Sequence, residues 1–540
     1  MKRCAHLVTT LSLLAAGSMA WTGCGSDVSE VGANSADITS SQCQILDVKT
    51  GRSMTQADLA KLNDPIAKFV LAGEGCPSDF QAISAKLRKT DVESCADDPS
   101  APPQGTKTRL VSERSQVMGA PQSYRAVISR ACGGREEHEL LLSSFGVSPN
   151  AAALPGEVEA IGADPDSHTF NFYAREEGKW KFFGNSLDLI ADGYECKDGA
   201  CTPKAAGERR CASCHVGGGL VMKELNTPWV HWEGDTTTPG AKELVEKHKM
   251  TLGDKADGRE LEHVIAKGNQ AYNANRIQFL KSKGVAELLR PLFCTLDVNL
   301  QSTNDSVLAM GPLFVSFDYF IDPAWSVFDS VAIPRADYDA LTTQFKQRIV
   351  DARGTQLKGL NNTPVTDTFF AFTYPERGGL NVDYVQQLVS ANVVDDEFVK
   401  DALFVDFTRP IFSSARCGLL DHAPTLGAEE VGPDAIRSGF VQKLAGVSDP
   451  AATAFLASLQ QSGDAAQHRE AVSKFMQACK ARPGKELASD MLTYASHLRR
   501  RMRGLTANSG QGVIEFSETM ATDDIADTTK AFDPETCILK

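Results

Sequence analysis

The chain has 540 residues and a formal net charge of −14 at pH 7. That length allows several domains, because a single domain usually holds roughly 100–200 residues. The acidic balance argues against non-specific nucleic-acid binding, which requires a basic surface, and no apolar stretch beyond the N-terminus is long enough to cross a bilayer.

Residues 1–23 predict an export signal, with a positively charged start followed by an apolar run from Leu7 to Ala20. The next residues, Trp21-Thr22-Gly23-Cys24, resemble the cleavage box of bacterial lipoproteins, in which the cysteine becomes the lipidated first residue. The resemblance implies an outer-membrane anchor at Cys24, facing the periplasm or the cell surface. Trp21 stands where that family usually has leucine, so cleavage after Ala20 and release into the periplasm is the alternative.

A tether is expected over residues 24–45, which are rich in small and polar side chains. Apolar residues then recur at helical spacing from about 52 to 92. Within this stretch Ser78, with Gln81 three positions on, predicts a capping box that opens a second helix. From about 108 to 184 the apolar period changes to two, which predicts a sheet with one buried face. Its expected strands lie at 124–128, 139–142, 157–161, 170–174 and 179–182.

The rest of the chain carries helical periodicity, with expected breaks at Gly268 and Gly284 and four helices between Pro433 and Leu505. The predicted class is therefore α+β. An N-terminal half, residues 46–235, contains an antiparallel sheet, and a mainly helical half covers residues 236–540. The arginines 499–501 and 503 are expected in the last turns of the final helix, where cations complement the helix dipole.

The run Cys211-Ala212-Ser213-Cys214-His215 follows the predicted sheet. Two thiols three positions apart, followed at once by an imidazole, resemble the haem-attachment motif of c-type cytochromes. The resemblance implies one covalent haem c, bound through Cys211 and Cys214, with His215 as the proximal iron ligand. A zinc site or a disulfide are the alternatives, and a structural zinc site usually needs a second ligand pair, which the sequence lacks.

The residues after the motif suggest the surroundings of a haem. Gly217 to Gly219 would let the backbone pass close to a flat group without Cβ clashes. His231 lies between two tryptophans and is the preferred second iron ligand. The other candidates are Met222, His248, Met250 and His263, or an open position, and a surface location is expected for the last three of these side chains.

The second ligand decides the expected function. Two strong ligands favour electron transfer with a redox partner protein or a small-molecule donor or acceptor, and this is the leading prediction. An open iron position favours a haem enzyme of peroxidase or oxidase type. A third possibility is a cell-surface binding protein in which haem is structural or sensory.

The sequence contains 14 cysteines. Once Cys4 in the signal, Cys24, Cys211 and Cys214 are assigned, ten remain, an even number that predicts up to five disulfides in an oxidising compartment. Only the Cys196–Cys201 pair can be argued locally, because a turn separates the two residues.

Overall fold

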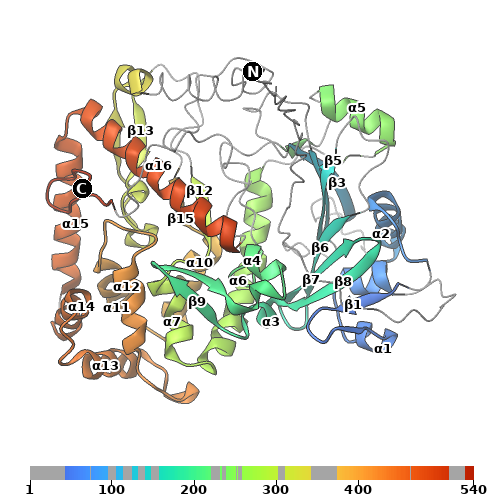
Figure 1. The fold of residues 1–540 in the computed structure, drawn as a ribbon, viewed down its shortest axis with the longest axis horizontal. Coiled ribbons are helices and arrows are strands. Elements are labelled where there is room, and N and C mark those ends of the chain that lie inside the picture. Colours follow the sequence, from blue (N-terminus) through green and yellow to red (C-terminus); the bar gives the residue numbers. More distant parts are fainter. Residues whose placement is uncertain are drawn as a thin grey trace, which may run out of the picture.

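The structure of the protein is a computed structural model with a sheet in its N-terminal half and mostly helices in its C-terminal half, which confirms the α+β prediction (Figure 1). The predicted signal, the Cys24 anchor and most of the tether lie outside the residues that the structure describes. Those described are 43–72, 75–94, 105–112, 124–131, 140–147, 157–220, 232–233, 239–250, 252, 258–301, 311–341, 374–461, 464–509 and 530–540.

Nine strands form the main sheet, in the order β11-β3-β4-β5-β6-β7-β8-β1-β2. All neighbours are antiparallel except β1 and β8, which are parallel. The five predicted strands correspond to β4 to β8, each extended by a few residues. The strands are β1 (Ile45–Asp47), β2 (Arg52–Ser53), β3 (Gly105–Ser112), β4 (Tyr124–Ala131), β5 (Leu140–Val147), β6 (Val158–Asp164), β7 (Thr169–Glu176), β8 (Lys179–Asn185) and β11 (Trp232–Glu233).

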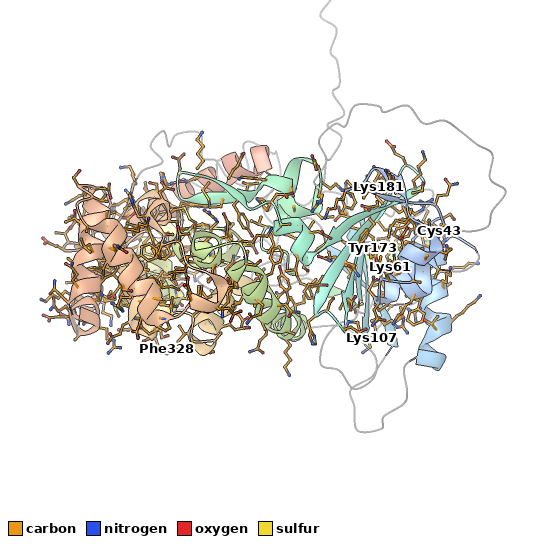
Figure 2. All side chains as sticks on the ribbon, turned by 90° about the horizontal axis from the view of Figure 1, so that it is seen from below. Cys43, Lys61, Lys107, Tyr173, Lys181 and Phe328 are labelled. Atoms are coloured by element: carbon orange, nitrogen blue, oxygen red, sulfur yellow. A yellow bond between two sulfur atoms is a disulfide. The ribbon has the colours of Figure 1, made fainter. Side chains whose placement is uncertain are left out.

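Both faces of this sheet are covered, so the prediction of one buried face is wrong. One face packs against helices from the N-terminal region and from α5, through residues such as Ile83 and Leu244. The opposite face packs against α4 and α6, and β7 is buried along its length up to Ala174. Figure 2 shows the N-terminal helices on one side of the sheet and the helical half of the chain beyond its opposite side. The covering helices are α1 (Gln56–Leu59), η1 (Ile66–Leu71), α2 (Phe80–Ser94), α4 (Cys211–Cys214), α5 (Pro239–His248) and α6 (Gly258–Lys281).

The carboxylate of Asp64 joins η1 to the sheet. It accepts hydrogen bonds from the backbone N–H groups of Ile66 and Ala67, at 2.8 and 3.1 Å. From the sheet it accepts the Tyr173 hydroxyl at 2.6 Å and the Asn171 amide at 2.8 Å. Asp64 is fully buried, and burial raises the pKa of its carboxyl above the ordinary value of 3.8.

The helix α2 begins one residue later than predicted. The Asp79 carboxylate accepts the Ala82 N–H at 2.8 Å, so Asp79, and not Ser78, caps the helix. The predicted partner Gln81 instead donates its side-chain amide to the carbonyl of His248. The capping-box prediction is therefore wrong, because a stronger acceptor follows the serine directly.

Helices dominate the second half of the chain, and their phenylalanines form a core that includes stacked Phe293 and Phe440. The predicted break at Gly284 is confirmed, whereas Gly268 lies inside α6, where a Cβ would sit 3.4 Å from the Phe170 ring. The four helices predicted near the C-terminus are all present. The helices are α7 (Val285–Phe293), α10 (Gly379–Ser390), α11 (Asp396–Phe404), α12 (Ser414–Gly418), α13 (Pro433–Leu444), α14 (Pro450–Gln460), α15 (Asp464–Ala481) and α16 (Gly484–Ser509).

Short elements complete this half. None of the helices in the described ranges is both long enough and apolar enough to span a membrane. Two small antiparallel pairs join β12 to β15 and β13 to β14. Their strands are β12 (Val298–Gln301), β13 (Leu313–Ser316), β14 (Ser330–Ile333) and β15 (Tyr374–Arg377), and the short 3₁₀ turns are η5 (Phe317–Tyr319), η6 (Pro323–Trp325), η8 (Leu419–His422) and η9 (Ala428–Glu430).

The hairpin of β9 (Tyr194–Lys197) and β10 (Ala200–Pro203) docks on the helical half. The Cys201 N–H donates to the Thr295 carbonyl at 2.8 Å. The helix α16 continues to Ser509, beyond the arginines that were expected in its last turns. Arg501 instead donates to the carbonyl of Asp198 in the hairpin turn and lies over the Phe412 ring at 5.0 Å.

Four disulfides join described cysteines, and the predicted Cys196–Cys201 pair is among them. Their number is typical of an oxidising, exported environment. Cys95 and Cys132 lie outside the described residues. The other three bridges are Cys43–Cys76, Cys294–Cys417 and Cys479–Cys537.

Candidate functional site

The Cys-x-x-Cys-His motif folds as a single helical turn, α4, followed by a tight loop. The backbone N–H of His215 donates to the Cys211 carbonyl at 2.8 Å, which closes the turn. Residues three apart in a helix lie on the same side, so this turn brings the Cys211 and Cys214 side chains to one face. Between them Ala212 is fully buried against the sheet, with Phe172 in the same cluster.

The imidazole of His215 is oriented by a backbone carbonyl. Its Nδ1 lies 2.8 Å from the Gly219 oxygen, and because a carbonyl can only accept, Nδ1 carries the proton. This tautomer assigns the ligand role to Nε2, and metal-binding histidines commonly show such a bond on their other nitrogen. The ring packs on Phe172 at a centroid distance of 4.9 Å.

The three glycines after the motif pack against protein side chains. A Cβ on Gly217 would lie 2.6 Å from the Leu380 side chain, and one on Gly219 would lie 2.7 Å from it. Gly218 has φ +76°, and its Cβ would lie 2.4 Å from the Tyr272 hydroxyl. At their Cβ positions these glycines are therefore packed by α6, α10 and the Ser186 backbone, and their expected approach to a flat cofactor stays a prediction.

Two tyrosines hold the carbonyls of this loop. The Tyr272 hydroxyl donates to Gly217 at 2.9 Å, and the Tyr194 hydroxyl donates to Val216 at 3.0 Å. Burial raises the pKa of both phenols, so both stay protonated and remain donors. Nothing in the sequence pairs these residues with the motif, since they reach it from α6 and from the β9–β10 hairpin.

A buried arginine lies directly behind the loop. Arg276 is fully buried, and its guanidinium would come within 3.2 Å of a Cβ on Gly217. It donates to the Asn381 side-chain oxygen at 3.1 Å and lies 4.6 Å from the centre of the Tyr384 ring. Among the described residues no carboxylate forms an ion pair with it. The loop therefore lies in the field of a fixed positive charge.

The two motif cysteines differ in state. The Cys211 thiol is free and half-buried, and burial, together with the nearby Glu159 carboxylate, raises its pKa well above the ordinary range. Cys214 is disulfide-bonded, and its partner is not among the described cysteines. One sulfur cannot hold a disulfide and a thioether together. Haem attachment at Cys214 therefore requires that this disulfide be opened or never formed.

The sheet separates two of the predicted second ligands from His215. His248 is buried and Met250 half-buried, against the expectation of surface positions, and Met250 packs with the cluster on the α2 face. The chain places His215 on the opposite face, against Phe172. Neither side chain can therefore reach an iron bound to His215. The remaining candidates, Met222, His231 and His263, have side chains outside the described set.

A second sulfur-rich site lies away from the motif. The sulfur atoms of two disulfides, Cys196–Cys201 and Cys294–Cys417, all lie within 4.8 Å of one another. In the disulfide form these sulfurs are not thiolate ligands for a metal. Sequence reasoning found the first pair but missed the cluster, because the other two cysteines are distant in the chain.

The chain was compared with protein-family models, curated proteins and solved structures. No family model, no curated protein and no solved structure matches the chain.

Proposed function

We propose that the chain is an exported electron-transfer protein that carries one covalent haem c at Cys211 and Cys214, with His215 as the proximal iron ligand. The observation that carries this proposal is the bond between His215 Nδ1 and the Gly219 carbonyl. That bond fixes the tautomer in which Nε2 can bind iron, and it does so directly after a helical turn that places two sulfurs on one face.

Haem would supply a one-electron iron couple, and the chain's own residues would set its ligand and its surroundings. His215 is held by Gly219 and by the Phe172 ring. The buried charge of Arg276 next to Gly217 favours the less positive, reduced state of a metal held by this loop. Replacing Arg276 with a neutral residue would accordingly lower the reduction potential.

The proposed location is the outer membrane, through a lipid on Cys24. The disulfides of the described chain support an oxidising compartment, and the sequence before Cys24 supports export. Replacing Cys24 with serine should move the protein from the membrane fraction to the soluble periplasmic fraction. An unchanged distribution would exclude lipidation at Cys24.

A second candidate function is favoured by one observation, the disulfide at Cys214. In this alternative the motif is structural and the protein is a haem-free binding protein of the cell envelope. The Cys214 sulfur can hold either a thioether to haem or a disulfide, so one chemical measurement distinguishes the two candidate functions.

The deciding experiment is acid–acetone extraction of the purified full chain. The protein is expressed in a bacterium whose periplasm contains the enzymes that attach haem covalently. We expect haem to stay with the polypeptide, to be lost in the Cys211→Ser/Cys214→Ser variant, and to stay in a Cys43→Ser/Cys76→Ser control, which removes a pair of cysteines elsewhere. His215→Ala should keep the covalent haem but change its absorption spectrum. A wild-type protein without haem, with Cys214 still in a disulfide by peptide mapping, would support the second candidate instead.

The ferric spectrum with and without cyanide tests the electron-transfer part of the proposal. Low-spin bands that cyanide does not change support a carrier with two strong ligands. A high-spin form that binds cyanide would instead indicate an open iron position and a haem enzyme.

A further inference from the structure

Two disulfides touch each other where the β9–β10 hairpin docks on the helical half. Cys196–Cys201 crosses the β9–β10 hairpin, where the two residues are directly opposite, and Cys294–Cys417 ties the end of α7 to α12. The Sγ atoms of Cys201 and Cys417 are 4.0 Å apart, so the two bridges are in contact. A thiolate formed at either position would therefore lie beside the other bridge.

Solvent reaches only one of the four cysteines in these two bridges. Cys196 is exposed, whereas the other three cysteines are buried. A dissolved dithiol can therefore attack Cys196 but has no direct access to the Cys294–Cys417 bridge, because thiol–disulfide exchange requires contact between sulfur atoms. The buried three have exposed fractions of 0% (Cys201), 2% (Cys294) and 8% (Cys417).

A cation stands next to the exposed sulfur. Arg290 Nη1 lies 3.2 Å from Cys196 Sγ. The Glu287 carboxylate holds the same guanidinium through two bonds of 2.9 and 2.7 Å, which fixes its position. A neighbouring arginine lowers the pKa of a thiol and stabilises its thiolate. Once the bridge is opened, Cys196 is therefore favoured as a thiolate and as a leaving group.

The backbone keeps Cys201 in place when its bridge opens. Its N–H donates to the Thr295 carbonyl at 2.8 Å, and the Thr295 N–H donates to the Gly199 carbonyl at 2.9 Å. Gly199 has φ +80°, and a Cβ there would lie 2.6 Å from the backbone of Phe412, so the turn is seated tightly. Cys201 therefore remains beside Cys417.

We propose that these four cysteines form a thiol–disulfide relay, which passes two electrons from a dithiol reductant in solution to the buried bridge. One thiolate of the reductant attacks Cys196 Sγ and expels the Cys201 thiolate. The second thiol of the reductant then attacks the mixed disulfide, releases the Cys196 thiolate and leaves the reductant as a cyclic disulfide. Cys201 attacks Cys417 Sγ, forms a Cys201–Cys417 bond and expels Cys294.

The net change is one bridge between Cys201 and Cys417 in place of two, with thiols at Cys196 and Cys294. The tie between α7 and α12 is replaced by a tie between the hairpin and α12. The relay does not depend on haem, and a dithiol of the cell envelope, small or protein-borne, is the class of reductant that it would accept.

The test is brief reduction of the full chain with dithiothreitol, followed by alkylation and peptide mapping. We expect a Cys201–Cys417 cross-link with alkylated Cys196 and Cys294. The Cys479–Cys537 bridge, whose residues are fully buried, is the control and should be reduced more slowly, by about tenfold, because access governs the rate. Alkylation of both Cys196 and Cys201 with an intact Cys294–Cys417 bridge would overturn the proposal.

A variant tests the attack of Cys201 on Cys417 without any reductant. Cys196→Ser leaves Cys201 without its partner, and we expect part of the purified protein to carry the Cys201–Cys417 bridge and a Cys294 thiol. If every molecule instead keeps Cys294–Cys417 and alkylates at Cys201, the relay is excluded. Arg290→Gln should slow the release of the Cys196 thiolate from the mixed disulfide, and therefore the reduction of the Cys196–Cys201 bridge in the dithiothreitol mapping assay, whereas an unchanged rate would remove Arg290 from the mechanism.

Discussion

Replacing Gly218 with alanine should damage the loop that positions His215. The substitution combines two costs, since Gly218 has φ +76° and its Cβ would lie 2.4 Å from both the Ser186 carbonyl oxygen and the Tyr272 hydroxyl. A non-glycine residue in the left-handed region costs roughly 1–2 kcal/mol. Overpacking of a tight site adds about 1–3 kcal/mol. The free energy of unfolding should therefore fall by roughly 2–5 kcal/mol.

Two matched glycines separate these costs. Gly51 has φ +66° with nothing within 4 Å of its Cβ position, so Gly51→Ala should show the backbone cost alone, roughly 1–2 kcal/mol. Gly207 is equally open and lacks a positive φ, so Gly207→Ala should change stability by less than about 0.5 kcal/mol. Guanidinium unfolding followed by circular dichroism measures the unfolding free energies of all three alanine variants. If Gly218→Ala costs no more than Gly51→Ala, the tight packing of the loop on α6 is refuted.

Three further outcomes concern the motif loop, the buried Asp64 and the Cys479–Cys537 bridge. Tyr272→Phe removes a buried hydrogen bond to Gly217 and should lower the unfolding free energy by about 1 kcal/mol in guanidinium titrations, and an unchanged midpoint would contradict the bond. Burial raises the pKa of Asp64 above 3.8, so the folded chain holds this proton to higher pH than the unfolded chain. That contribution is fully present below pH 3.8 and is lost as pH rises through the folded pKa. The unfolding free energy of Asp64→Asn should therefore rise relative to that of the wild type as the pH increases. Guanidinium midpoints of the two proteins that run parallel with pH would contradict the raised pKa of Asp64. Cys479→Ser/Cys537→Ser opens a loop with a sequence separation of 58 and should cost about 4 kcal/mol, measured by thermal unfolding, whereas an unchanged melting temperature would show that this bridge adds no stability.

The strands of the sheet could be predicted because their signal is local. Alternation along residues 157–182, with turns at Asp164 and at Glu177-Gly178, defines β6 to β8 without reference to the rest of the chain. The burial of both faces could not be predicted in the same way. It depends on α5 and α6, which follow in the sequence, and a buried β7 shows continuous burial instead of alternation.

The motif of the candidate site could be predicted from the sequence, but the packing around it could not. The spacing of Cys211, Cys214 and His215 is a local pattern, so the motif could be recognised directly. The packing behind the glycines could not, because Arg276 and Leu380 reach them from distant helices. Gly268 also depends on distant packing, since it lies inside α6 and its small size serves contact with Phe170 and not a turn.

The packing of the motif loop also sets an order of events during synthesis and export. The loop at Gly217 to Gly219 is completed by residues of α6 and by Leu380, which emerge about 50 to 165 positions later in the chain. Until those helices arrive, the two motif sulfurs have no finished structure around them. The late contacts thus leave an interval in which Cys214 is present before its loop is complete, and under the proposed function this is the interval in which haem attachment would compete with disulfide formation.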